Sequence, residues 1–249
     1  KNWRTADRYV QEIEKEVGTL STRVFRAGTR GALKIVFWSS IEKASNNIFQ
    51  EELEKQIFQG RKKEDFSAFD IYQHVPEKNK KVSVENEKSE EDTDIKELAS
   101  SLQNTEKQLI IFSGNLSFIN LEYNKRPILS YIDDLIKKGV NVKIICRVDI
   151  AGKENIEKIL SLNFKNGKEL IEIRHREQPL RCIIIDKRIL RIKEIKEPTG
   201  KKNELKNKIF IFYTIKDKEW IEWLSRIFWK MFSFSIDSRK RIDEMRKKV

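Results

Sequence analysis

From about residue 105 onward, short runs of branched apolar residues alternate with longer amphipathic stretches, and no other feature constrains the fold as strongly. The runs typical of strands are QLIIFSG, VKIICRV, ELIEIRH, LRCIIID, ILRIKE and KIFIFYTI. Between the first three, the stretches with helical periodicity are RPILSYIDDLIKKGV and KENIEKILSLN. Because alternating strands and helices build sheets covered by helices, the sequence predicts an α/β domain with a partly parallel sheet.

The last strand-like run is followed by DKEWIEWLSRIFWKMFSFS, which is apolar on nearly every side. A helix of this kind is buried, so its aromatic residues are predicted to lie in the core rather than on a binding face. The chain then ends in the basic segment DSRKRIDEMRKKV. We expect this segment to be a solvated end or an arm that contacts phosphates.

The first segment of the chain has apolar or small residues three and four positions apart, which is the spacing of a coiled coil. It predicts a helix that pairs two chains, or one that lies on its own domain, through Trp3, Ala6, Val10, Ile13, Val17, Leu20, Val24 and Ala27. Gly28 and Gly31 are predicted to end this helix. Further helices are predicted over about residues 32–46, 47–59 and 66–75. No hairpin pattern is evident, so a winged helix is not expected.

Residues 76–93 hold many charges and few apolar side chains, which is typical of a solvated linker. Asp94 is expected to cap a helix that ends near Leu102. The predicted organisation is a helical region with a dimerising coiled coil over residues 1–75, then the charged linker. An α/β domain with a basic C-terminal helix follows over residues 94–249.

The charge of the chain points to an anionic partner. Of its 249 residues, 36% are charged, and the formal net charge is +12. Such an excess favours binding to a polyanion, usually nucleic acid and sometimes an acidic membrane. The alternative is a soluble protein whose extra positive charge is spread thinly over its surface.

Cys146 and Cys182 lie inside apolar runs, as reduced and buried thiols of a cytoplasmic protein do. Two cysteines and two histidines are too few for a Cys/His zinc site, and we expect neither a metal nor a cofactor. No apolar run approaches about 18 residues and no signal peptide is evident, so a membrane span is not predicted. The chain starts at Lys1 rather than at methionine, and we expect an upstream part.

The stretch QPLRCIIID fits the catalytic pattern His-x-Lys-x4-Asp everywhere except at its first position. Arg181 stands at the place of the lysine, and Asp186 stands at that of the aspartate. Pro179 takes the place of the histidine and offers neither a nucleophile nor an acid. The guanidinium of Arg181 is suited to bidentate phosphate binding, while Asp186 either orients it or ends the strand.

This motif and the succession of elements over about residues 105–235 resemble the phospholipase D-like superfamily. The resemblance implies a phospholipase D-like sheet flanked by helices, preceded here by a mainly helical N-terminal region. In active members two such motifs meet, the histidine attacks phosphorus, the lysine holds the phosphate, and the aspartate helps to position the catalytic groups.

Only one such motif is found in this chain, so we expect no covalent chemistry. His175 lies four residues upstream of Pro179 and cannot replace the missing histidine by register. It is interpreted as a half-buried strand residue that alternates with Ile171 and Ile173. A remaining anion or ligand site is predicted at Arg181, Asp186 and His175.

Within the superfamily, the chain resembles archaeal TrmB-type transcription regulators. These join a DNA-binding domain, a dimerising helix and a catalytically inert phospholipase D-like effector domain. The resemblance implies a DNA-associated regulator that forms a homodimer and binds a ligand or partner. Two alternatives stay open, namely a divergent phosphodiesterase or nuclease and a membrane-surface adaptor that binds acidic lipids.

Double-stranded DNA is the expected partner, bound without strong sequence preference. Basic side chains can neutralise phosphates, and no base-reading helix is evident. The residues predicted to contact nucleic acid are Arg174, Arg176, Arg188, Arg239, Lys240, Arg241, Arg246, Lys247 and Lys248. Arg181 is predicted to face the groove where catalysis takes place in active relatives.

Overall fold

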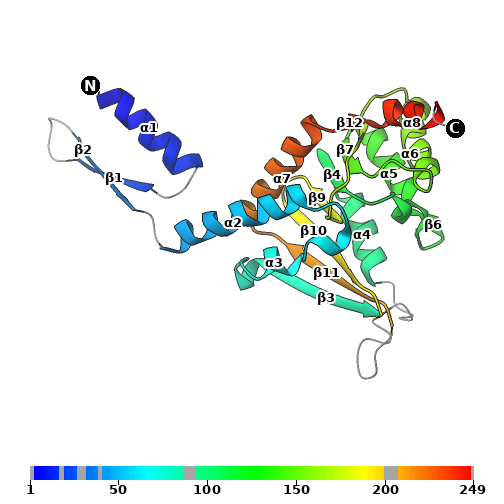
Figure 1. The fold of residues 1–249 in the computed structure, drawn as a ribbon, viewed down its shortest axis with the longest axis horizontal. Coiled ribbons are helices and arrows are strands. Elements are labelled where there is room, and N and C mark those ends of the chain that lie inside the picture. Colours follow the sequence, from blue (N-terminus) through cyan, green and yellow to red (C-terminus); the bar gives the residue numbers. More distant parts are fainter. Residues whose placement is uncertain are drawn as a thin grey trace. The chain divides into compact units, whose positions relative to one another are not determined.

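The computed structural model describes residues 3–16, 20–26, 32–38, 41–86, 93–198 and 207–247. The chain divides into two compact units, Lys1–Lys55 and Gln56–Val249. The helix α2 (Ile41–Gln59) crosses the boundary between them (Figure 1).

A helix and a β-hairpin form most of the first unit. The helix α1 (Trp3–Glu16) is followed by β1 (Leu20–Arg26), which pairs antiparallel with β2 (Ala32–Trp38). Glu14 of α1 accepts hydrogen bonds from the backbone N–H and the hydroxyl of Thr22, at 3.3 and 3.0 Å. These bonds join the helix to the first strand of the hairpin.

This hairpin corrects three predictions. The helix expected from Trp3 to Ala27 ends at Glu16, so a coiled coil of more than three heptads is wrong. The helix expected over residues 32–46 is replaced by a strand over residues 32–38, and a hairpin lies where none was expected. Both strands are rich in β-branched and aromatic residues, and their cross-strand pairing overrides the helical spacing.

The helices that follow were predicted only in part. A single helix, α2, occupies residues 41–59, where two helices divided near Asn47 were expected. The helix predicted over residues 66–75 is shorter, namely α3 (Phe69–Tyr72). The two glycines that were predicted to end the first helix lie outside the described residues.

Much of the predicted linker belongs to the main sheet. The strand β3 (Lys80–Asn86) pairs antiparallel with β11 (Ile209–Ile215). Val82 and Val84 alternate with polar residues, as in a strand at the edge of a sheet, but the surrounding charges concealed this pattern. The prediction of a linker is wrong for this strand, and residues 87–92 lie outside the described part.

Among the described residues, the second unit is built on an eight-stranded sheet in the order β12-β8-β7-β4-β9-β10-β11-β3. The strands β8, β7 and β4 are parallel to one another, and the other neighbouring pairs are antiparallel. The six runs that the sequence indicated all form strands of this sheet. The remaining bounds are β4 (Gln108–Phe112), β7 (Asn141–Cys146), β8 (Ile171–His175), β9 (Cys182–Ile185), β10 (Ile189–Lys196) and β12 (Ile236–Asp237).

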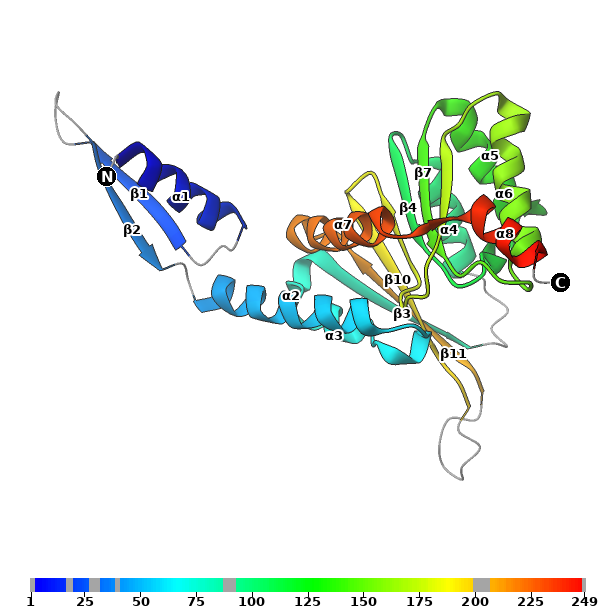
Figure 2. The ribbon, with the colours of Figure 1, turned by 45° about the horizontal axis from the view of Figure 1, so that its top comes forward.

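Helices cover both faces of this sheet, which confirms the predicted α/β class. The helices α4, α5 and α6 pack on one face, while α7 lies on the other (Figure 2). Phe228 of α7 meets Phe112 of β4 edge to face, with 5.1 Å between the ring centroids. The bounds of these helices are α4 (Thr93–Gln103), α5 (Ile128–Lys138), α6 (Lys153–Asn166) and α7 (Lys218–Ser233).

Both cysteines are buried in the sheet, as predicted. Burial raises the pKa of Cys146 to about 12, and it also raises the pKa of Cys182. Both thiols are therefore protonated at neutral pH and poorly reactive.

In the part of the chain that the structure describes, no helix is long and apolar enough to cross a membrane.

Candidate anion-binding site

Arg181 lies directly before β9, beside the loop that follows β4. Its Nη1 donates hydrogen bonds to the carbonyl oxygens of Leu180, at 2.7 Å, and Gln178, at 3.4 Å. A Cβ atom on Gly114 would lie only 2.8 Å from Arg181 Nη2, so a side chain there would displace the guanidinium. Burial lowers the pKa of Arg181, and Arg147 adds to this as a nearby positive charge. Among the described residues, no carboxylate forms an ion pair with it.

Pro179, which stands where the pattern His-x-Lys-x4-Asp has its histidine, is buried. Its ring packs against Gly60, since a Cβ atom on Gly60 would come within 2.7 Å of Pro179 Cγ. The buried amide of Gln178 fixes the same loop, because it donates to Ser113 O at 3.0 Å and accepts from Leu180 N at 2.6 Å. The position that the pattern gives to histidine is therefore taken by a proline ring that packs in the interior.

Asp186 lies at the opposite end of β9 from Arg181, about 16 Å away for five extended residues. Its carboxylate accepts hydrogen bonds from the backbone N–H groups of Glu106, Lys107 and Gln108, at 2.9, 2.8 and 2.9 Å. The residue itself adopts the left-handed conformation, with φ of 49°. Asp186 therefore holds the start of β4, and its predicted place in an anion site with Arg181 is wrong.

His175 ends β8 as the half-buried strand residue that the sequence predicted. Its Nδ1 accepts a hydrogen bond from Val148 N at 2.9 Å, which leaves the ring proton on Nε2. Burial lowers the pKa of His175, and the nearby charge of Arg241 adds to this effect. His175 does not line the pocket that contains Arg181, so these two residues do not form one site.

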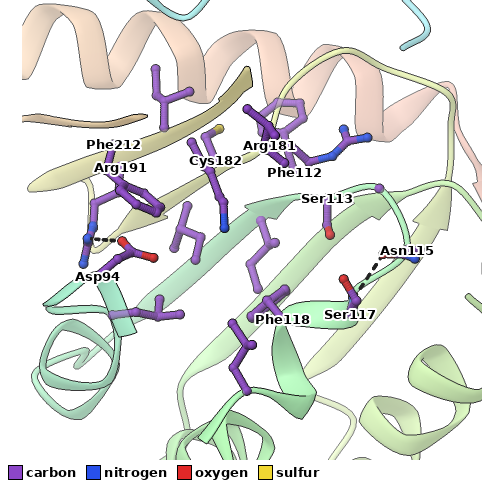
Figure 3. Close-up of a pocket in the computed structure, with 18 of the residues that line it drawn as sticks. Asp94, Phe112, Ser113, Asn115, Ser117, Phe118, Arg181, Cys182, Arg191 and Phe212 are labelled. Carbon is purple, nitrogen blue, oxygen red and sulfur yellow. Dashed lines mark hydrogen bonds and ion pairs between the residues drawn. The ribbon is translucent and has the colours of Figure 1, made fainter. Parts of the chain in front are cut away.

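A cavity of about 330 Å³ opens beside Arg181, on the sheet face that α4 partly covers. Figure 3 shows Arg181 and Ser113 on one side of this pocket and the pair of Arg191 and Asp94 on the other. The charged and large apolar side chains that line the pocket include Asp94, Leu98, Ile111, Phe118, Leu121, Arg147, Arg181, Ile183, Arg191, Lys193, Ile195 and Phe212.

Most charged groups of this pocket already have partners. Arg191 binds Asp94 at 2.7 Å and Glu97 at 3.2 Å. Arg147 binds Asp149 at 2.6 Å. Asp94 was expected to cap α4 but lies in its first turn and holds Arg191 instead. Burial raises the pKa of Asp94 to about 6, even though Arg191 opposes this shift.

Lys193, like Arg181, is an exception among these charges. Its Nζ lies over the rings of Phe210 and Phe212, 4.3 and 5.1 Å from their centroids, and it pairs with no carboxylate among the described residues. Lys193 was not among the site residues predicted from the sequence. The available signal was the alternation of Arg191 and Lys193 with apolar residues along one strand, which places both side chains on the same face.

Two of the arginines predicted to contact nucleic acid have structural roles. Arg174 binds Glu172 at 2.7 Å, donates to Phe232 O at 2.8 Å and packs over the Phe232 ring. Arg176 lies 5.4 Å from the ring of Phe58, and burial lowers its pKa. The prediction that both are exposed contacts is wrong. Arg188 is exposed, as expected, but it forms an ion pair with Asp186 at 2.8 Å.

The basic C-terminal segment forms the helix α8 (Ser238–Arg246), which packs on the domain through the buried side chain of Ile242. The ion pairs of its predicted contact residues are Arg239 with Glu169 at 3.6 Å, Arg241 with Glu244 at 3.4 Å and Arg246 with Glu157 at 3.4 Å. Lys240 and Lys247 are exposed, and Lys248 lies outside the described residues.

No protein-family model and no curated protein matches this chain. Among solved structures, the chain is similar to Nuc from Salmonella typhimurium, a phospholipase D family member, at 14% identity with a TM-score of 0.45. That similarity covers 64% of this chain and 97% of Nuc. NucT from Helicobacter pylori gives 15% identity, a TM-score of 0.45, and coverage of 64% and 99%.

The chain is also similar to TrmBL2, an archaeal chromatin protein described as showing a novel mode of DNA binding. The identity is 15% and the TM-score is 0.43, over 94% of this chain and 82% of TrmBL2. Nuc is described as a phospholipase D family member, which is the superfamily that the sequence resembles.

Proposed function

We propose that this chain is a non-catalytic, DNA-associated regulatory protein whose α/β unit binds a ligand or partner instead of cleaving a phosphodiester. One observation carries the proposal: Pro179 stands at the nucleophile position and is buried against Gly60. Arg181 remains beside it with no carboxylate partner among the described residues. A group that binds anions is therefore present where a group that attacks phosphorus is not.

The absence of catalysis is tested with purified chain and a phosphodiester reporter, bis(p-nitrophenyl) phosphate, alongside DNA and RNA. We expect no turnover with any of them. Turnover that survives Arg181→Ala but is abolished by His175→Ala would contradict the proposal. It would identify His175 as a working base and favour the alternative of a divergent phosphodiesterase or nuclease.

The hairpin of the first unit supports a DNA partner. Residues 17–40 include no aspartate or glutamate, whereas Arg23, Arg26, Arg30 and Lys34 are basic. A two-stranded ribbon with this composition can neutralise phosphates, and the ladder between β1 and β2 fixes its shape. Since the arginines predicted on the second unit are mostly paired, we assign the main DNA contact to the hairpin.

The DNA proposal is tested by fluorescence anisotropy with duplex DNA over a series of salt concentrations. Affinity should fall steeply with salt, with a log–log slope of about −0.9 per phosphate neutralised. The double variant Arg23→Gln with Arg26→Gln should reduce the magnitude of that slope by about 2. The matched control, Arg239→Gln with Lys240→Gln, removes two charges from α8 and should change it little.

Two outcomes would overturn the DNA assignment. A slope that responds only to the α8 variant would move the contact to the C-terminal helix, as the sequence had predicted. Binding to acidic vesicles without binding to DNA would favour the membrane-surface adaptor. Deleting residues 239–249 is a poor test, because it removes Ile242, whose side chain is buried in the core.

A homodimer remains part of the proposal, although the long coiled coil that motivated it is not present. The helix α1 leaves the apolar side chains of Tyr9 and Ile13 exposed, so it keeps a surface that a second copy can cover. Light scattering should give the mass of a dimer, and Ile13→Glu should shift the mass towards that of a monomer. A native monomer would remove the dimer from the proposal.

A cytoplasmic location is also part of the proposal, because both cysteines are reduced and cytoplasmic proteins keep their thiols in that state.

A further inference from the structure

The pocket beside Arg181 combines an apolar surface with a positive charge that has no negative partner. Its apolar walls come from Leu98 of α4, from Leu121 in the loop after β4, and from Ile183, Ile195 and Phe212 of the sheet. Lys193 lies among these side chains, and burial lowers the pKa of its ammonium group. An ammonium group in such surroundings is stabilised by a bound anion.

The strand register explains why Lys193 faces this pocket. Lys193 is paired with Phe212 on β11, and its backbone N–H donates to Arg181 O across β9 at 2.8 Å. Residues that lie opposite one another in an antiparallel sheet share a face. Two positions away on β10, Arg191 is paired with Ile183 and therefore points to the same face.

Burial lowers the pKa of Lys193; the acidic groups near it, Asp94 and Glu85, act to raise that pKa as nearby negative charges, but neither forms an ion pair with it. Asp94 and Glu97 both bind Arg191. Glu85 of β3 accepts a hydrogen bond from Asp94 N at 2.9 Å. The two phenylalanine rings over which Lys193 lies attract its charge but accept no hydrogen bond of ordinary strength from its ammonium group. The pocket therefore contains a cation that can donate to a ligand.

We propose that this pocket binds a small organic anion with an apolar body. Its acidic group pairs with Lys193, and its hydrocarbon part lies between Leu98, Leu121, Ile195 and Phe212. The cavity of about 330 Å³ is at the small end of the range for ligand pockets, so the ligand is a compact molecule rather than a polymer. The inference deepens the ligand-binding part of the proposed function and does not depend on DNA binding.

The pocket should bind the whole ligand more tightly than a molecule that has only its acidic group or only its apolar body. Inorganic phosphate would use the ammonium group but leave the apolar walls bare. A neutral alcohol would cover the walls but leave Lys193 without a counter-ion. Because both contributions are needed, an amphiphilic anion should bind more tightly than either one.

Isothermal titration calorimetry of the full chain tests the inference with octyl phosphate, kept below its micelle concentration. 1-Octanol and inorganic phosphate serve as the two partial probes. We expect one molecule of octyl phosphate to bind per chain, at least about tenfold more tightly than either partial probe, which corresponds to about 1.4 kcal/mol. Octanol or inorganic phosphate binding as tightly as octyl phosphate would overturn the inference.

Variants then assign the charge to Lys193. Lys193→Met should weaken octyl phosphate binding about tenfold or more, because it keeps the length and apolar character of the side chain but removes the ammonium group. Lys193→Arg should restore most of the affinity. The matched control is Lys218→Met, at a side chain that is 84% exposed on α7, and it should bind like the native chain. Unchanged binding by Lys193→Met would overturn the assignment.

Thermal melting and DNA binding of each variant complete the experiment. A folded Lys193→Met variant that still binds DNA but has lost octyl phosphate supports a separate ligand site. If the native chain binds octyl phosphate as expected but fails to bind DNA, the regulatory function is wrong while the pocket assignment stands. If it binds DNA but not octyl phosphate, the pocket assignment is wrong and the DNA proposal stands.

Discussion

One face of the large sheet is covered and apolar over one half, whereas over the other half it borders a pocket and carries charged side chains. Over β4, β7 and β8, the helices α4, α5 and α6 bury a continuous cluster of aliphatic residues that includes Ile144 and Ile173. Over β9, β10 and β11, the same face carries Arg191 and Lys193 and borders the pocket. The strands of the two halves are paired in register, so their geometry does not explain the difference.

The difference follows from what lies above each half. Helices that pack directly on a sheet exclude water, and the residues beneath them must be apolar or fully paired. Where a helix covers only part of the face, a lysine can be only partly buried while its ammonium group lies over aromatic rings, as Lys193 does. We therefore expect the covered half to supply most of the stability, and the open half is where we propose that a ligand binds.

The largest effect is expected from shortening a side chain in the covered half. Ile144 is fully buried, and Ile144→Ala should lower the free energy of unfolding by about 2–5 kcal/mol through lost burial and a new cavity. The matched variant in the open half is Ile195→Ala, which should lower it by less than about 1 kcal/mol because its side chain already borders the pocket. Urea denaturation measures both, and equal losses would contradict the contrast between the halves.

The next effect is expected at Asp186, which lies on the border between the halves. Asp186→Ala leaves three backbone N–H groups without their acceptor and should lower the free energy of unfolding by about 1–3 kcal/mol. Although burial opposes it, these hydrogen bonds lower the pKa of Asp186 in the folded state. The native chain should therefore exceed Asp186→Ala in unfolding free energy by the full amount at pH values above the pKa of the unfolded state. This difference should decrease as the pH falls below that pKa. A pH-independent difference would show that charge plays no part.

Asp94 in the open half should show the opposite dependence on pH. Its pKa is raised to about 6 by burial, with Glu85 and Glu97 acting in the same direction and Arg191 and Lys193 against it. The folded state thus binds the proton more tightly than the unfolded state, whose pKa is near 3.8. Stability from this group is present below that value and is lost as the pH rises through about 6.

The measurement is the unfolding free energy of the native chain minus that of Asp94→Asn, followed from acidic to neutral pH. This difference should decrease by an amount on the order of 2 kcal/mol as the pH rises. Carboxyl carbon NMR of Asp94 gives the pKa directly. A titration near the ordinary aspartate value would contradict the effect of burial on this group.

The contrast between the halves also explains which parts of the structure were predictable. Strands and helices beyond residue 105 have strong apolar periodicity and turn signals, so the sheet and its helices were found from sequence. The hairpin over residues 20–38 was missed because apolar residues in its strands happen to fit helical spacing too. The edge strand β3 was missed because its charges outnumber its two valines.

The site was predictable only where the motif names a residue. Arg181, which lines the candidate pocket, was singled out because it stands in a recognisable pattern, whereas Asp186 was grouped with it although the length of β9 separates them. Spacing in a sequence does not say which end of a strand faces a pocket. Lys193 was not found because its role depends on where α4 stops covering the sheet, which is a property of tertiary packing.

The smallest effect is expected from Lys193 itself. Lys193→Met should raise the free energy of unfolding of the ligand-free chain by about 1 kcal/mol, because it replaces a partly buried charge without a counter-ion by an apolar side chain of similar length. The gain should disappear when octyl phosphate saturates the native chain, since a ligand that binds only the folded state stabilises it. Thermal and urea denaturation, with and without octyl phosphate, measure the stability gained by the variant and the stability that the ligand adds to the native chain. A loss of stability in the ligand-free variant would mean that Lys193 supports the fold through its aromatic contacts, and the open half would then be a structural region like the covered one.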